Sequence, residues 1–239
     1  MKSKNTNLLF ILPNLFTAAS VFAGVFSMIS AINAEFNQAA WLILVSLILD
    51  GLDGRVARLT NTCSRFGLEF DSLADIVAFG VAPALLMYLF VGHEFGRFGI
   101  VASALFVIFG AVRLARFNVM TSQIEPSVFI GVPIPTAAVF VSLLVLLFEK
   151  YSIENDYGII IMILSIFVSF LMVSNIRYPS FKKINFSQKH MLKLFVVILF
   201  VALSIFMYPI EGITLIFTLY LLYGVVRALT LLPKHLARK

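Results

Sequence analysis

Eight long apolar runs occupy most of this 239-residue chain and leave it few ways to fold. Each run approaches the ~20 residues that an α-helix needs to cross a bilayer. The runs are continuous rather than alternating, which excludes a membrane β-barrel. Only 13% of the residues are charged, too few for a soluble domain of this size. The runs lie at about 8–32, 37–59, 72–92, 98–118, 133–150, 157–175, 191–208 and 211–232.

We therefore predict an all-α, polytopic membrane helix bundle of about eight transmembrane helices. The chain is expected to form a single domain over residues 1–239, with a core at about 8–185 and two further helices at about 191–232. Its one cysteine, Cys63, excludes an internal disulfide framework. The net charge of +6 fits a membrane face that meets anionic lipids and phosphate groups, so we expect membrane lipids and no nucleic acid as partners.

The basic residues predict how the bundle is oriented. In bacterial membranes Lys and Arg concentrate on the cytoplasmic side. A cytoplasmic N-terminus with eight helices places 16 of the 18 Lys and Arg residues inside and leaves only Arg97 and Lys150 outside. An odd number of helices would break this partition. The sequence thus predicts an inner-membrane protein with both termini in the cytoplasm.

Four aspartates stand at the ends of two of these apolar segments. Asp50 and Asp53 have a spacing of three residues, and Asp71 and Asp75 have a spacing of four, so each pair shares one helix face. The short polar link at 60–70 makes the two helices an antiparallel hairpin, in which the pairs face each other at the cytoplasmic side. The full pattern is D-x-x-D-G-x-x-A-R-x₈-G-x-x-x-D-x-x-x-D, formed by Asp50, Asp53, Gly54, Ala57, Arg58, Gly67, Asp71 and Asp75.

This pattern indicates a metal and phosphate site. Ionisable groups in membrane segments usually have a function. Four carboxylates repel one another, two divalent cations would balance them, and oxygen ligands favour Mg²⁺ or Mn²⁺. Gly54 and Ala57 allow a ligand to approach the backbone, and the planar Arg58 fork suits a phosphate. The alternative, acids that cap helix starts, accounts for Asp71 and Asp75 but not for Asp50, which lies two turns inside its helix.

The eight residues resemble the signature of the CDP-alcohol phosphatidyltransferase family, and all eight positions match. The resemblance implies a metal-dependent reaction in which an alcohol attacks the β-phosphate of a CDP-linked lipid and CMP leaves. It also implies a homodimer, which is usual in the family. The implied metal ligands are Asp50, Asp53, Asp71 and Asp75, with Asp75 also the general base. The implied contacts to the CDP-linked lipid are Gly54, Ala57, Arg58 and Gly67.

The first apolar run contains a second resemblance. Its segment Pro13-Asn14-Leu15-Phe16-Thr17 is similar to the P-N-x-x-T-x-x-N pattern of the family, which implies that Asn14 and Thr17 lie beside the cytidine or the diphosphate. The chain departs from the pattern at Ser20, where the family has Asn. The alternative is that Asn14 and Thr17 make hydrogen bonds between helices.

Segments beyond the signature resemble the integral-membrane phosphatidylserine synthases of this family. The similar segments are 66–75, 79–84, 113–118, 129–135 and 174–179. This resemblance implies CDP-diacylglycerol and L-serine as substrates. Arg113 or Arg116 suits the serine carboxylate or a lipid phosphate, and Asn118 suits the amino group. The alternative is that both arginines only anchor their helix at the interface.

Other functions stay open at this point. The same chemistry is possible with glycerol 3-phosphate or inositol as the acceptor. An intramembrane prenyltransferase also uses aspartates and Mg²⁺, but it does not require the glycine, alanine and arginine positions of the signature. A cation transporter would place its acidic site near the bilayer centre, whereas these aspartates gather toward the cytoplasmic face.

Overall fold

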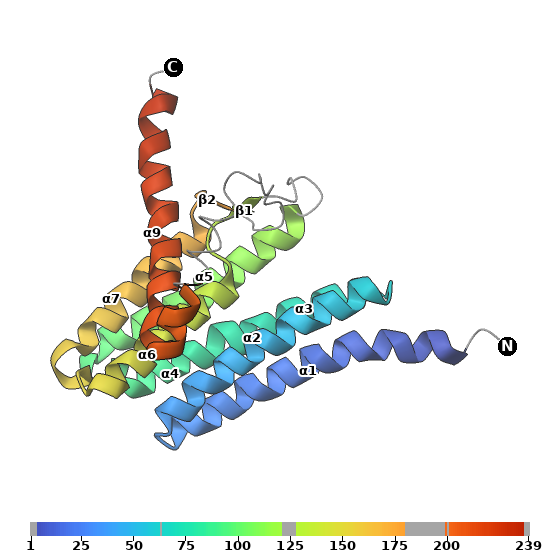
Figure 1. Ribbon diagram of the computed structural model, residues 1–239, viewed down its shortest axis with the longest axis horizontal. Coiled ribbons are helices and arrows are strands. Elements are labelled where there is room, and N and C mark those ends of the chain that lie inside the picture. Colours follow the sequence, from blue (N-terminus) through green and yellow to red (C-terminus); the bar gives the residue numbers. More distant parts are fainter. Residues whose placement is uncertain (1–3, 63, 121–127, 180–198, 200, 237–239) are drawn as a thin grey trace.

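The computed structural model describes residues 4–62, 64–120, 128–179, 199 and 201–236. This part of the chain is a helix bundle with one two-stranded ribbon (Figure 1), so the predicted all-α class is confirmed. The helices are α1 (Lys4–Ile32), α2 (Phe36–Leu59), α3 (Arg65–Asp75), α4 (Ala82–Phe90), α5 (Arg97–Met120), α6 (Ile134–Tyr151), α7 (Glu154–Val173) and α9 (Pro209–Leu236). A π-helical turn, Ile76–Val81, joins α3 to α4, and a 3₁₀ turn, Gly92–Phe95, follows α4.

Six spans in the described residues are long and apolar enough to cross a membrane. Seven of the predicted helices correspond to described ones, while half of the prediction at 191–208 falls outside the described residues. The count of eight and the position of the termini therefore stay predictions.

The helix that contains Asp71 begins earlier than the sequence suggested. We predicted its start at residue 72 after a polar link at 60–70, but α3 begins at Arg65. Ser64 caps it, because its Oγ accepts a hydrogen bond from the Gly67 backbone N–H at 3.0 Å. Asp71 therefore lies almost two turns inside α3, so it is not a capping residue.

A π-helical turn follows immediately after Asp75 and explains how the helix continues into α4. Pro83 has no N–H, and its ring would collide with the carbonyl of Phe79 in a regular α-helix. The wider turn relieves this conflict, and its residues Ala78, Phe79 and Gly80 are buried. Burial of this π-helical turn in the core therefore holds the last turn of α3, which carries Asp75, in place.

The α6 helix forms the centre of the bundle. Twelve of its eighteen residues are buried, and it contacts α2, α7 and α9. Its entry is a turn in which Gly131 has a φ of +75° and in which a Cβ would lie 2.2 Å from the Met172 carbonyl oxygen, so only glycine fits. Pro133 and Pro135 stand in the positions before and inside the first turn that tolerate proline.

A short antiparallel ribbon, which the sequence did not predict, lies at the same end of the bundle as the aspartates. It pairs β1 (Val128–Ile130) with β2 (Arg177–Pro179), and Phe129 stands opposite Tyr178. In Figure 1 the ribbon, the end of α5 and the start of α3 lie at one end of the bundle, and the turns after α1, α4 and α6 lie at the other. The fold thus brings the signature and the end of α5 together.

Candidate active site

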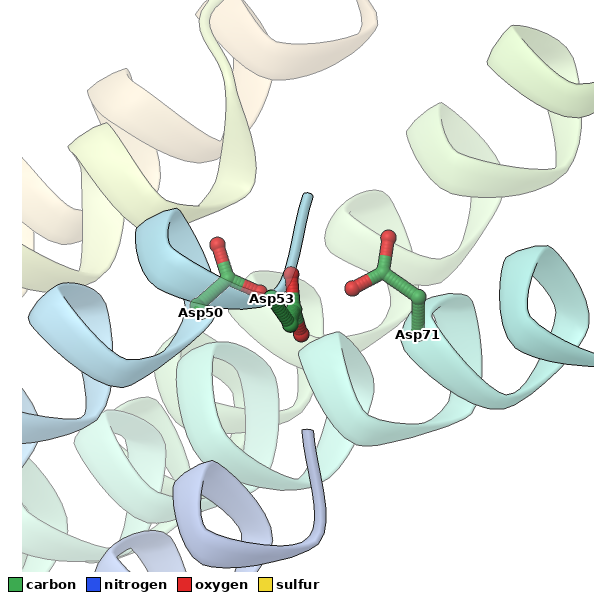
Figure 2. Close-up of side chains that lie close together, drawn as sticks. All are labelled: Asp50, Asp53 and Asp71. Atoms are coloured by element: carbon green, nitrogen blue, oxygen red, sulfur yellow. The ribbon is translucent and has the colours of Figure 1, made fainter. Parts of the chain in front are cut away.

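Three aspartates from α2 and α3 converge as the hairpin prediction required. Carboxylate oxygens of Asp50, Asp53 and Asp71 all lie within 4.8 Å of one another. Figure 2 shows the three side chains gathered between the two helices. Asp53 is buried, while Asp50 and Asp71 are half-buried. The arrangement offers oxygen ligands from two helices to one small space.

Asp75 stands one turn further along α3 and touches the same group. Its side chain is only 8% exposed and lies within hydrogen-bonding reach of Asp50. Its Oδ1 is buried and has no hydrogen-bond partner among the described residues. Since a buried polar atom without a partner is costly, this oxygen is suited to receive a proton or a ligand.

Hydroxyl groups of α1 hold α2 in place below the aspartates. Thr17 donates a hydrogen bond from Oγ1 to Asp53 Oδ2 at 2.7 Å, which is the interhelical bond that the sequence left as an alternative. Further along, the hydroxyls of Ser20 and Ser46 lie 2.7 Å apart, and Ser46 precedes Asp50 by one turn. Ser46 was not among the residues predicted from the sequence, although a hydroxyl inside the apolar run 41–49 indicates a contact between helices.

A cavity of about 220 Å³ lies beside the aspartates. Asp53 and Asp71 form one side of it, so the carboxylates border the space directly. All six residues that the sequence assigned to the CDP-linked lipid line this cavity: Asn14, Thr17, Gly54, Ala57, Arg58 and Gly67. The structure thus brings together three separate segments of the chain that the resemblance had linked.

Arg113 approaches Asp75 from α5. Its guanidinium is buried, lies 5.2 Å from the centroid of the Phe117 ring, and interacts electrostatically with Asp75. The two groups do not form an ion pair, because the one pair within 4.0 Å in the described part of the chain joins Lys150 to Glu211. The guanidinium nitrogens therefore lie more than 4.0 Å from the carboxylate oxygens of Asp75.

Asn118, the last residue assigned to the acceptor, contacts α3. Its Nδ2 donates a hydrogen bond to Ser72 Oγ at 3.0 Å, and Ser72 lies between Asp71 and Asp75 in the chain. Asn118 therefore stands at the edge of the aspartate group and connects the end of α5 to α3.

Arg116 points away from the aspartates and binds backbone. Its Nη1 donates to the Val173 carbonyl at 2.9 Å and to Asn175 Oδ1 at 3.2 Å. Its Nη2 donates to the carbonyls of Ile130 and Ser174 at 3.3 and 3.1 Å. These bonds satisfy carbonyls at the end of α7 and tie them to β1. The four Nη hydrogens are thus used within the protein, which argues against the predicted role of Arg116 in acceptor binding.

The comparison with known proteins agrees with the signature. The profile of the CDP-alcohol phosphatidyltransferase family matches residues 10–171, which include every residue of the signature. The chain belongs to this family. Its members depend on a divalent metal, and the three clustered carboxylates with the unpartnered Asp75 oxygen fit such an ion in number and chemistry.

Named relatives match three quarters of the chain or more. A CDP-diacylglycerol–serine O-phosphatidyltransferase of Helicobacter pylori is 52% identical over 98% of this chain and 97% of its own length. The enzyme of the same name from Methanocaldococcus jannaschii is 34% identical over 87% of this chain and 92% of its own length. An archaetidylserine synthase of Methanothermobacter thermautotrophicus is 36% identical over 75% of this chain and 74% of its own length.

We predict that Arg116→Lys destabilises the protein without weakening acceptor binding. Lysine keeps the charge but cannot hold four acceptors in one plane, so the free energy of unfolding should fall by about 1–3 kcal/mol. Thermal unfolding in detergent measures the change, and Arg55→Lys, at an exposed position of α2, is the control. Unchanged stability together with a raised KM for the acceptor would return Arg116 to the acceptor site.

Proposed function

We propose that this chain transfers the phosphatidyl group of CDP-diacylglycerol to the hydroxyl of L-serine, giving phosphatidylserine and CMP. The observation that carries the proposal is the aspartate group beside a cavity lined by the signature residues. The choice of serine draws on relatives that carry the name serine O-phosphatidyltransferase over nearly the full chain.

Asp50, Asp53 and Asp71 would hold the divalent metal, with Asp75 sharing the site. The charge of four carboxylates fits two ions, Mg²⁺ or Mn²⁺. When bound, such ions neutralise the diphosphate and the departing CMP. The hydrogen bond from Thr17 fixes the orientation of Asp53, and the packing of α1 against α2 keeps the ligands in place.

The cavity would take the cytidine and diphosphate of the lipid substrate. Arg58 borders it and offers a planar fork to a phosphate. Gly54 has no side chain and Ala57 has only a methyl group, so a ligand can lie directly against this face of α2. Asn14 and Gly67 close the other side, where Asn14 Oδ1 would be 3.5 Å from a Cβ placed on Gly67.

Asp75 and Arg113 would position the acceptor between them. Asp75 Oδ1 accepts the proton of the serine hydroxyl as that oxygen attacks the β-phosphate, because it is buried and unpartnered. Arg113 receives the serine carboxylate, since a buried guanidinium requires an acceptor for its donors. Asn118, whose Nδ2 donates to Ser72 between Asp71 and Asp75 in the chain, suits the amino group.

The arginines also bear on the acceptors that compete with serine. A phosphorylated acceptor such as glycerol 3-phosphate carries two negative charges and needs several cations. Arg116 is engaged with backbone carbonyls, which leaves Arg113 as the arginine of α5 beside Asp75. One guanidinium suits a carboxylate better than a phosphate, which favours serine.

The remaining parts of the proposal concern place and assembly. We propose that the protein lies in the inner membrane with this site at the cytoplasmic face. At that face, serine can enter from the cytoplasm and CMP can leave into it. The proposal also includes a homodimer in contact with membrane lipids. The exposed apolar surface of the outer helices fits a lipid surround.

The first test is CMP release by the purified protein in detergent. CDP-diacylglycerol and Mg²⁺ or Mn²⁺ are supplied with L-serine, glycerol 3-phosphate, inositol or no acceptor. We expect release that requires serine and stops reversibly when EDTA removes the metal. Release with another alcohol instead would reassign the acceptor, and release that persists in excess EDTA would refute the metal site.

Asp75→Asn should lower kcat by at least about 10²-fold, because an amide cannot accept the hydroxyl proton. Steady-state kinetics at saturating serine and metal measures the loss. Glu69→Gln, an exposed change of the same chemistry on α3, should leave kcat unchanged. Near-normal turnover in Asp75→Asn would remove Asp75 from the role of base.

Gly54→Ala should raise the KM for CDP-diacylglycerol about tenfold, the effect of losing ~1.4 kcal/mol of binding. The protein itself tolerates the methyl, because its nearest neighbour would be the Arg58 guanidinium at 3.9 Å. Gly51→Ala is the matched control, since its Cβ would meet nothing within 4 Å and Gly51 does not line the cavity. Equal kinetics for the two variants would place the nucleotide elsewhere.

A further inference from the structure

The last described helix, α9, lies outside the range matched by the family profile, yet it docks next to the proposed acceptor site. It contacts α6 and β2 (Figure 1). On β2, the fully buried ring of Tyr178 lies against α9 at Gly224, where a Cβ would be 2.0 Å from the ring. Glycine is needed here to let the two elements approach, so this part of α9 has a defined position.

Tyr178 in turn supports a second tyrosine of α9. The ring of Tyr220 lies 5.3 Å from that of Tyr178, with the planes tilted by 37°. The Tyr178 hydroxyl donates a long hydrogen bond of 3.5 Å to the Leu221 carbonyl, the residue next to Tyr220. Ring packing and hydrogen bonding together fix the α9 backbone and the Tyr220 ring at this point.

The ribbon links Tyr220 to the end of α5 that bears Arg113, the residue proposed to bind the acceptor. Arg116, one turn from Arg113, donates to the Ile130 carbonyl of β1. Ile130 pairs with Arg177, the neighbour of Tyr178 on β2.

Tyr220 and Arg113 interact electrostatically, as Arg113 does with Asp75. Arg113 thus packs on Phe117 of its own helix and interacts electrostatically with Tyr220 of α9. The described residues give Arg113 aromatic neighbours and charges, and none accepts a hydrogen bond from it, in contrast to the four acceptors around Arg116.

From this arrangement we infer that Tyr220 is part of the acceptor site and that its phenol hydroxyl, together with the Arg113 guanidinium, holds the carboxylate of an amino-acid acceptor. The inference rests on the proposed function and adds a specificity-determining residue to it. One cation and one neutral donor match a singly charged carboxylate, which has two oxygens to satisfy. A phosphate dianion would find too little positive charge at the same place.

The arrangement also assigns a task to α9. The signature on α2 and α3 supplies the metal ligands and the nucleotide cavity, which the family shares whatever its alcohol. Arg113 and Tyr220, the groups that hold the acceptor in this inference, stand on α5 and α9, so the residues that select the alcohol come from different helices than those that catalyse the transfer. Tyr178 is the positioning residue that keeps the Tyr220 ring in place.

Tyr220→Phe tests this inference with Tyr223→Phe as the matched control. Phenylalanine keeps the ring that packs on Tyr178 and removes only the hydroxyl, so the variant should fold. Tyr223 stands three residues away on α9 and is 53% exposed. The measurements are KM for L-serine, KM for CDP-diacylglycerol, kcat and the thermal midpoint in detergent.

We expect Tyr220→Phe to raise the KM for serine about tenfold, as for the loss of ~1.4 kcal/mol. The KM for CDP-diacylglycerol and the thermal midpoint of Tyr220→Phe should stay at the values of the unmodified protein. Tyr223→Phe should equal the unmodified protein in both KM values, in kcat and in the thermal midpoint. A residue that serves packing alone would not separate the two KM values in this way.

Two results would overturn the inference, and they are distinguishable. Serine-dependent CMP release with an unchanged KM for serine in Tyr220→Phe would overturn the role of Tyr220 and leave the proposed function standing. Absence of serine-dependent release from the unmodified protein would overturn the proposed function and this inference with it.

Discussion

Mutual repulsion among carboxylates is the constraint on which the rest of this structure depends. Oxygens of three aspartates lie within 4.8 Å of one another, and two unit charges at that distance repel by roughly 3.5 kcal/mol at an effective dielectric constant of ~20. The fold holds the group together all the same. Thr17 donates to Asp53, the Ser20–Ser46 pair locks α1 against α2, and Ser64 starts α3. Divalent cations of the kind on which the family depends would neutralise such a group.

Arg113 and Arg116 stand one turn apart on α5 but have different roles in this structure, because different elements surround them. Arg116 reaches the end of α7 and β1, where its Nη groups donate to three backbone carbonyls and to Asn175 Oδ1. Arg113 turns toward Asp75, with Phe117 and Tyr220 beside it. The first joins the ribbon to the bundle, and the second is available to a ligand. The end of α5 is therefore both a structural joint and a wall of the proposed acceptor site.

Much of the fold and most of the proposed cavity could be predicted from the sequence. The hydrophobic runs predicted the helices because their length and continuity leave few other folds in a bilayer. The short link after Leu59 required a hairpin, and the hairpin brought Asp50 and Asp53 to Asp71. Helix spacing then put Gly54, Ala57 and Arg58 on the α2 face beside them. The start of α3 was predicted wrongly, because the cap at Ser64 has no strong pattern and the charges at Arg65 and Glu69 looked like a link.

The sequence by itself determined the class of the protein, its aspartate group and its family, since these depend on local spacing and on hydropathy. Only the tertiary structure decided what lies across from Asp75. Nothing local in the sequence separates Arg113 from Arg116, because their roles depend on α7, β1 and α9, which lie far along the chain. The same holds for Tyr220, which resembles any aromatic residue of a membrane helix until Gly224 and Tyr178 fix α9 against β2. Contacts between distant segments follow from packing, and packing is a property of the whole fold.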